Sequence, residues 1–277
     1  MNNGITTYDS ITTKEEAVNP TKSYFSSDEG LETFKDYVRS RKLGDFLAVY
    51  LLVIIAGFVA IIASLINDAD LDLFTTVISL YSIIGFGSLL IFSIVVLCSR
   101  FSALKRMSAA NPLLNAAYKH SKRSLALSLL AGLTDSVTDS AGPGIINVIG
   151  DLASAGLDIA SSIEGYKSEY KLIYGILQEV KKDNDKSIAF KHGFDYVHRA
   201  KALLWLGIIM MVIFGIVEVF ATLKDAHFAI SIPSIICGVL IIGFLTFAVI
   251  RNEIIYFRFL KSCLEEFERA NLKNKSF

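Results

Sequence analysis

The sequence predicts an all-α integral membrane protein in which two transmembrane hairpins flank a cytoplasmic helical hairpin. One observation is the composition, because 53% hydrophobic and only 19% charged residues are too apolar for an ordinary globular chain. A second is that the excess apolar residues fall into four blocks, which predict four transmembrane helices. The third is a long central segment, residues 145–180, where apolar residues recur at alternating steps of four and three, as on one helix face.

Residues 1–27 are predicted to be a disordered cytoplasmic tail. They are rich in Asn, Thr and Ser, bury too little apolar surface to fold, and lack the apolar core of a cleavable signal. Ser26 followed by Glu29 matches a capping box. We therefore expect a helix over residues 28–45 that leads into the membrane.

The four apolar blocks are each long enough to cross a bilayer. Residues 46–66 and 73–98 form the first hairpin (46–98), and residues 203–223 and 228–250 form the second (203–250). About 20 residues at a rise of 1.5 Å match a hydrocarbon core of roughly 30 Å. Three of the blocks carry no charged residue.

Glu218 is the one ionisable residue within a predicted span, which makes it a candidate functional residue. It lies about five residues, or roughly 7.5 Å, from the end of its block, so its carboxylate can reach water. A pore or proton role is the alternative to a structural role at the interface. We favour the structural role.

The flanking cations predict the orientation of the spans. Cations stand on the outer sides of both hairpins: Arg39, Arg41, Lys42, Arg100, Lys105, Arg106, Lys119, Lys122, Arg123, His198, Arg199, Lys201, Arg251, Arg258 and Lys261. The turn of the first hairpin instead holds three aspartates, and that of the second holds Lys224 against Asp225. The positive-inside rule places both termini and the central segment in the cytoplasm.

The central cytoplasmic segment, residues 99–202, is predicted to be a helical hairpin. Asn111 and Pro112 end the extension of the second span, a helix follows from Leu113 towards Asp139, and residues 141–144 form a turn. The heptad helix, residues 145–182, then extends for about 54 Å. Its first half is not expected to be a fifth span, because two aspartates at about +2.5 to +3.5 kcal/mol each outweigh an apolar gain of about −4 kcal/mol.

The heptad stripe is the predicted interface. We expect it to drive self-assembly or to bind a protein partner through Ile159, Ile163, Tyr166, Tyr170, Ile173 and Leu177. The preceding helix is too short to cover all of it. The C-terminal half should therefore meet another chain or the amphipathic cytoplasmic helix predicted over residues 251–277, where Tyr256, Leu260, Cys263 and Phe267 share a face.

The two hairpins also share short sequence similarities. Tyr37 and Val38 precede the first span much as Tyr196 and Val197 precede the third, and Ala110-Asn111 is similar to Ala270-Asn271. These matches suggest a parallel internal repeat. Chance matching between apolar segments of similar composition is the alternative.

No catalytic motif is present, and we predict neither an enzyme nor a cofactor or metal site. The four histidines are dispersed, the three cysteines lack disulfide or zinc spacing, and the zero net charge gives no attraction to nucleic acid. Four aspartates would meet if the central helices fold back: Asp135, Asp139, Asp151 and Asp158. They would then suit a hard cation, although a solvated acidic face is the interpretation we favour.

The function predicted from these features is that of a non-enzymatic multi-pass membrane protein whose cytoplasmic helices mediate assembly or partner binding. The bilayer is its first partner. A small oligomeric channel or pore-forming effector is one alternative, and a reticulon-like membrane-shaping protein is another.

Overall fold

The computed structural model describes residues 22–65, 71–140, 145–223 and 232–276, and all the regular structure in these residues is helical. This confirms the predicted all-α class. A 3-10 turn, Tyr24–Ser26, precedes six long helices. They are α1 (Asp28–Leu65), α2 (Leu71–Met107), α3 (Pro112–Ser140), α4 (Ile145–Asp183), α5 (Ala189–Leu223) and α6 (Ile232–Lys275).

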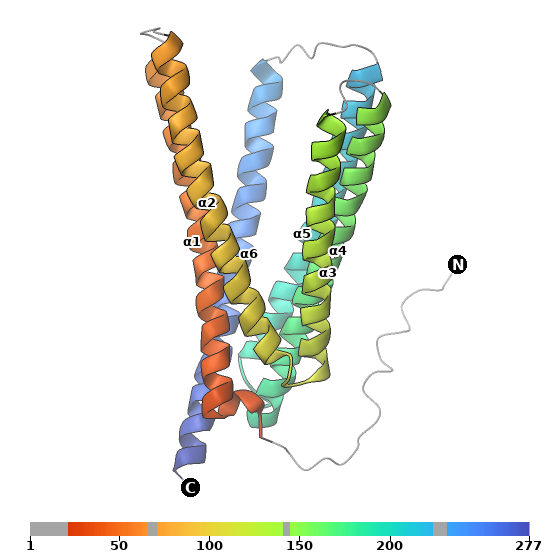
Figure 1. Ribbon diagram of the computed structural model, residues 1–277. Coiled ribbons are helices and arrows are strands. Elements are labelled where there is room, and N and C mark those ends of the chain that lie inside the picture. Colours follow the sequence, from red (N-terminus) through yellow and green to blue (C-terminus); the bar gives the residue numbers. More distant parts are fainter. Residues whose placement is uncertain (1–21, 66–70, 141–144, 224–231, 277) are drawn as a thin grey trace, which may run out of the picture.

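The helices alternate in direction and converge at one end (Figure 1). There, residue 22 and the C-terminal end of α6 lie on the same side of the molecule. Towards the other end the helices diverge into separate arms: α1 with α2, the start of α6, and α3 with α4 and α5. The connections between α1 and α2 (66–70), α3 and α4 (141–144) and α5 and α6 (224–231) lie outside the described residues, and the predicted turn at Pro143 is in the second of them.

The core fills the converged end. Phe25, Phe34 and Phe267 form a cluster with ring centroids 5.1–5.3 Å apart. Around this cluster lie Tyr256, Leu260 and further apolar side chains from α1, α2, α3, α4 and α5. Burying each such side chain contributes about 1.5–3 kcal/mol, so this end carries most of the packing stability.

The N-terminal turn is part of this core, and here the predicted tail boundary was wrong. Phe25 and Ser26 are buried, and the buried Glu179 carboxylate accepts hydrogen bonds from Ser23 Oγ and from the Tyr24 backbone N–H at 3.1 and 3.0 Å. The predicted capping box also shifts by one residue. Ser26 donates its hydroxyl to Asp183, and Ser27 Oγ instead accepts from the Gly30 N–H at 3.1 Å.

The helical boundaries of the central segment agree with prediction. Pro112 is the first residue of α3, where its missing N–H costs nothing, and Asn111 Oδ1 caps the helix by accepting from the Leu114 N–H at 3.0 Å. The helices α3 and α4 pack along their length through serines: Ser168 Oγ donates to the Ala117 carbonyl at 2.8 Å. Cys98 and Cys263 are free thiols.

Among the described residues, one helical stretch is long and apolar enough to cross a membrane, namely Thr76–Met107 in α2. Almost none of it is buried within the molecule. The other three predicted spans each include residues whose side chains lie outside the description.

Candidate functional site

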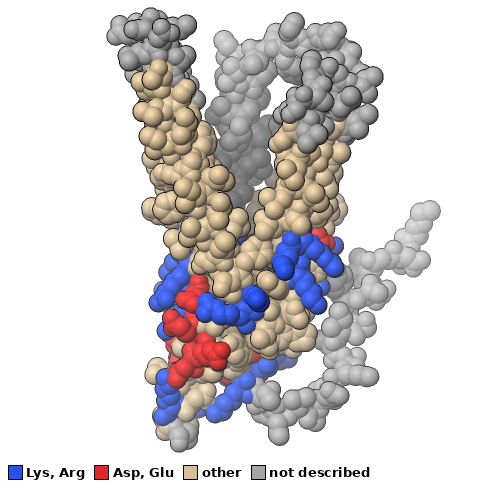
Figure 2. Space-filling view, in the orientation of Figure 1, with Lys and Arg blue, Asp and Glu red and all other residues tan. Residues whose placement is uncertain are grey.

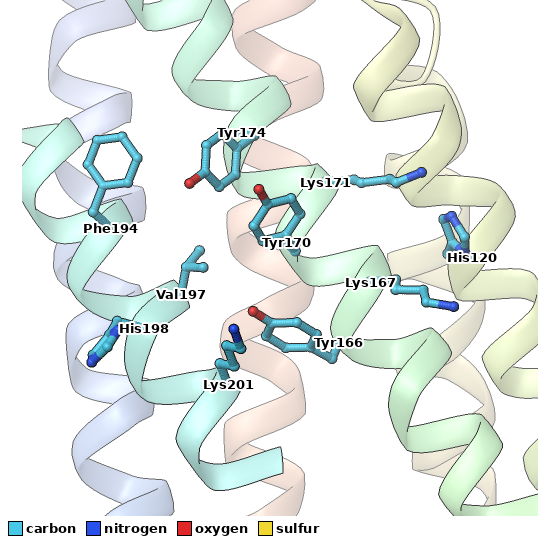
Figure 3. Close-up of a pocket in the computed structure, with 10 residues that line it drawn as sticks. All are labelled: His120, Tyr166, Lys167, Tyr170, Lys171, Tyr174, Phe194, Val197, His198 and Lys201. Atoms are coloured by element: carbon cyan, nitrogen blue, oxygen red, sulfur yellow. The ribbon is translucent and has the colours of Figure 1, made fainter. Parts of the chain in front are cut away.

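An open groove lies on the face of α4 between α3 and α5 (Figure 3). Its volume is about 770 Å³. Ten residues line it: His120, Tyr166, Lys167, Tyr170, Lys171, Tyr174, Phe194, Val197, His198 and Lys201. The groove is thus both aromatic and basic, and no described acidic residue is among its lining residues.

The aromatic floor follows from helical spacing on α4. Tyr166, Tyr170 and Tyr174 stand four residues apart and therefore share one face. The ring centroids of Tyr166 and Tyr170 are 6.2 Å apart, and those of Tyr170 and Tyr174 are 4.5 Å apart. Phe194 of α5 continues the row, with its ring centroid 5.7 Å from that of Tyr174. The three tyrosines point from α4 towards α5 (Figure 3).

The cations of the groove differ in how they are paired. Glu164 is bonded to Lys167 Nζ at 2.9 Å and to His120 Nδ1 at 2.6 Å. Hydrogen bonds from Lys167 and His120 lower the pKa of Glu164. Within the described residues, Lys171 and Lys201 form no ion pair, and Lys201 points into the space beside Tyr166 and Tyr170 (Figure 3).

This arrangement suits a ligand with a negative charge and an apolar part. Tyrosine rings offer apolar area with a hydroxyl at the edge, and lysines supply positive charge and donors. No metal-binding cluster of His, Cys, Asp or Glu occurs among the described residues.

A layer of charged and phenolic side chains crosses the molecule where the arms begin to diverge. Arg41 of α1 approaches Glu253 of α6 at 2.6 Å and Glu169 of α4 at 3.5 Å. Arg100 of α2 lies 3.7 Å from Glu169, and Tyr196 of α5 donates to Glu169 Oε2 at 2.7 Å. Five helices therefore meet at one polar network.

The electrostatics of this layer follow from its burial. Burial disfavours the charge of Arg41, but the attraction of Glu169 and Glu253 outweighs this, so the pKa of Arg41 lies well above its ordinary value. Burial and the negative charge of Glu169 raise the pKa of Tyr196, which therefore stays a neutral donor. The Arg41 guanidinium also lies 4.8 Å from the centroid of the Tyr256 ring.

A second cavity of about 600 Å³ adjoins the layer on the side of the diverging arms. Serines of α3 and α4, together with Arg100, Glu169, Asn252 and Glu253, form much of its lining. Three buried polar atoms of the layer have no hydrogen-bond partner: Arg41 Nε, Asn252 Oδ1 and Glu253 Oε2. Such atoms are costly to bury, and the cavity that Asn252 and Glu253 line has space for water or an ion.

The structure separates the residues predicted from the heptad stripe. Ile173 and Leu177 are buried in the core of the same chain, against α6 among other elements. Tyr166 and Tyr170 line the groove, while Ile159 and Ile163 are half-buried nearer the N-terminal end of α4. The side chain of Glu218 lies outside the described residues.

Several site residues were missed by sequence reasoning. Arg41 and Arg100 were counted only as flanking cations, and Glu169 was not named as a candidate site residue. Glu253 carried a usable signal, since it is an acidic residue among the cations just beyond an apolar block. The sequence did not identify Tyr174 and Phe194 as site residues, because the contact between their rings depends on the alignment of α4 and α5.

Comparison with known proteins gives no further guide to this site. No protein-family model matches the chain, and no match is found among curated proteins or solved structures.

Proposed function

We propose that this chain is a non-enzymatic, four-span membrane protein whose cytoplasmic helices bind an anionic, partly apolar ligand in the groove between α3 and α5. The observation that carries the proposal is the lining of the groove. Three lysines, two histidines and four aromatic residues line it, and within the described residues Lys167 and His120 pair with Glu164 while Lys171 and Lys201 form no ion pair. At about 1 kcal/mol per lysine near a charged surface, such a site discriminates strongly for anions.

The position of the polar layer supports four spans. The predicted apolar blocks begin at residues 46 and 203 and end at residues 98 and 250, each within seven residues of Arg41, Arg100, Tyr196 or Glu253. A single plane therefore lies at the base of all four blocks. Above this plane large apolar side chains are exposed, including Ile83 and Leu90 of α2, as expected of surfaces that face lipid.

The charge distribution supports the same arrangement. Lys and Arg side chains gather around the waist of the molecule, and the arms beyond this band are almost free of charge in this view (Figure 2). A cationic band at the base of apolar arms is the pattern of a cytoplasmic headgroup layer. The start of α1 and the end of α6 lie at the same end of the molecule (Figure 1), which supports a cytoplasmic location for both.

Partner binding or self-assembly through the heptad helix would then use its exposed part. Ile173 and Leu177 are buried in the core and cannot contact a partner. The stripe residues that are only partly buried are Ile159, Ile163, Tyr166 and Tyr170. Two of these four residues line the groove. The proposed ligand site in the groove therefore overlaps the interface predicted from the heptad stripe.

A photoreactive amino acid at Tyr170 tests this proposal in intact cells. Irradiation should attach a molecule to the groove, and Lys171→Gln with Lys201→Gln should reduce the yield. The matched control is Lys181→Gln with Lys186→Gln, which removes the same charge from exposed lysines outside the groove lining. The absence of any adduct, or equal yields in both double variants, would contradict a binding role.

A channel is the second candidate, and the cavity beside the polar layer is the observation that favours it. Glu253 Oε2 is buried there without a partner, beside a cavity of about 600 Å³. Reconstituted protein should then conduct cations, and Glu253→Gln should lower the conductance. No conductance from well-folded protein in liposomes would exclude this candidate.

A further inference from the structure

The groove lies at the depth of the lipid headgroups if α5 crosses the membrane as proposed. Lys201 stands two residues before residue 203, where the apolar block of α5 begins. Trp205 follows one helical turn after Lys201 and is 56% exposed. Tryptophan and tyrosine concentrate at membrane interfaces because one part of each side chain is apolar and another is polar.

The surface above the groove is apolar and continuous with it. Ile209 of α5 is exposed one turn beyond Trp205. A ligand whose charged part lies beside Lys201 can therefore extend an apolar part along the outside of α5. Phospholipids have this shape, with a phosphate at one end and acyl chains at the other.

The side chains around the groove match a phosphate ester. Lys167, Lys171 and Lys201 supply positive charge from two helices, and Lys201 extends beside the row of tyrosines (Figure 3). A volume of about 770 Å³ is within the usual range of small-molecule sites. Lys167 contributes less than the other two lysines because Glu164 already binds it.

We propose that the groove binds the headgroup of an anionic phospholipid, with the phosphate beside Lys201 and the acyl chains along α5 beyond Trp205. This inference rests on the proposed function, because it needs α5 to cross the membrane and the groove to bind an anion. An acidic protein segment fits less well. It would have to enter a groove at the membrane surface, where lipid headgroups are already present at high local concentration.

The test is lipid analysis of the full-length protein extracted from mixed vesicles of phosphatidylcholine and phosphatidylglycerol. Lipids that remain bound after purification are identified by mass spectrometry. The wild type should be enriched in phosphatidylglycerol over the vesicle composition. Two unpaired lysines at about 1 kcal/mol each give an enrichment of about thirtyfold, which Lys171→Gln with Lys201→Gln should abolish.

Two comparisons make this result specific. Lys181→Gln with Lys186→Gln should keep the enrichment. Glycerol phosphate, which has the phosphate but no acyl chains, should fail to displace the bound lipid. Displacement would show that a free phosphate ester is the ligand, and bound lipid of bulk composition would show that the groove has no headgroup preference; either result would overturn the inference.

The photoreactive variant at Tyr170 separates this inference from the proposed function. An adduct of protein size, without enrichment of phosphatidylglycerol, would overturn the lipid inference and leave a binding role for the groove intact. If neither an adduct nor enrichment is found, both proposals fail.

Discussion

Arg41 joins three helices through its guanidinium, which contacts Glu169 of α4 and Glu253 of α6. Its side chain is only 11% exposed. An arginine so placed is costly to desolvate, and its ion pairs offset that cost only while both carboxylates remain. Replacing it leaves Glu253 without its ion-pair partner and leaves Glu169 with only Arg100, at 3.7 Å.

Arg41→Ala should therefore lower the free energy of unfolding by about 3–5 kcal/mol. Arg39→Ala is the control, because Arg39 is 68% exposed and its ion pairs with Glu32 and Asp36 are on the surface. The control should cost less than about 1 kcal/mol. Thermal unfolding of both variants in detergent measures the difference, and equal losses would mean that the polar layer does not hold the helices together.

Tyr256 shows why single residues were hard to predict. Its hydroxyl lies 2.8 Å from that of Tyr37, and its ring lies 4.7 Å from that of Tyr196. Tyr37 and Tyr196 are the residues that the repeat interpretation paired from the sequence. The sequence could match them to one another, but it could not reveal that both converge on a residue more than 50 positions away along the chain.

The helices themselves were largely predictable, because each depends on local signals. Asn111 and Pro112 mark the start of α3, and the regular apolar spacing marks α4 over nearly its full length. What covers each helix was not predictable. Periodicity identifies the buried face of α4, but Ile173 and Leu177 are covered because α5 and α6 pack beside them, and that depends on contacts distant in sequence.

The packing at Gly193 illustrates this dependence. A Cβ atom there would lie 3.1 Å from side-chain atoms of both Leu177 and Phe259. A side chain at this position would require Leu177 and Phe259 to shift by a few tenths of an ångström, so glycine favours the close approach of α5 to α4 and α6. Only this alignment brings Phe194 next to Tyr174 and completes the groove.

Ile173→Asp with Leu177→Asp should unfold the chain and not merely dissociate an assembly. Each of these buried side chains is worth about 2–5 kcal/mol, which together approach the total stability of a typical domain. Ile159→Asp with Ile163→Asp changes half-buried positions of the same stripe and should cost less. Circular dichroism and size analysis in detergent separate the cases: a stable variant of lower mass would show that Ile173 and Leu177 form an interface between chains.

The hairpin of α3 and α4 lies beside the part of α5 that is proposed to cross the membrane, whereas the sequence predicts a cytoplasmic central segment. Glu169 bonds to Tyr196, and Tyr174 contacts Phe194, so the antiparallel register places residues 145–163 beside residues 203–223. On α3, Leu129, Leu130 and Leu133 are 51–63% exposed at this level. The aspartates oppose insertion by about 2.5–3.5 kcal/mol each, whereas the exposed leucines and the contact with α5 favour it.

We expect lipid to cover these leucines. A cysteine at Leu130 should then react slowly with a water-soluble maleimide in vesicles, although the position is exposed in the protein itself. A cysteine at Leu272, which is 67% exposed near the C-terminal end of α6, is the control and should react fast once the vesicles are opened. Fast reaction at both positions would mean that the hairpin of α3 and α4 lies in water, outside the bilayer, despite its contact with α5.

The whole molecule consists of a compact base and apolar arms that diverge from it. The base contains the aromatic core, the layer around Arg41 and the groove, and Lys and Arg side chains form a band across the face shown in Figure 2. The described parts of the arms expose large apolar side chains. Both features are explained if the band marks the cytoplasmic face of a membrane and the arms cross it.

Cysteine labelling in intact cells tests this topology most directly. Single cysteines are placed in a variant lacking Cys98, Cys237 and Cys263, at Asp70 and Asp225 in the predicted outer turns and at Lys182 and Lys273 in the base. An impermeant maleimide should label the first two positions from outside and the last two only after the cells are opened. External labelling at Lys182 would contradict the four-span account, and with it the placement of the groove at the inner membrane surface.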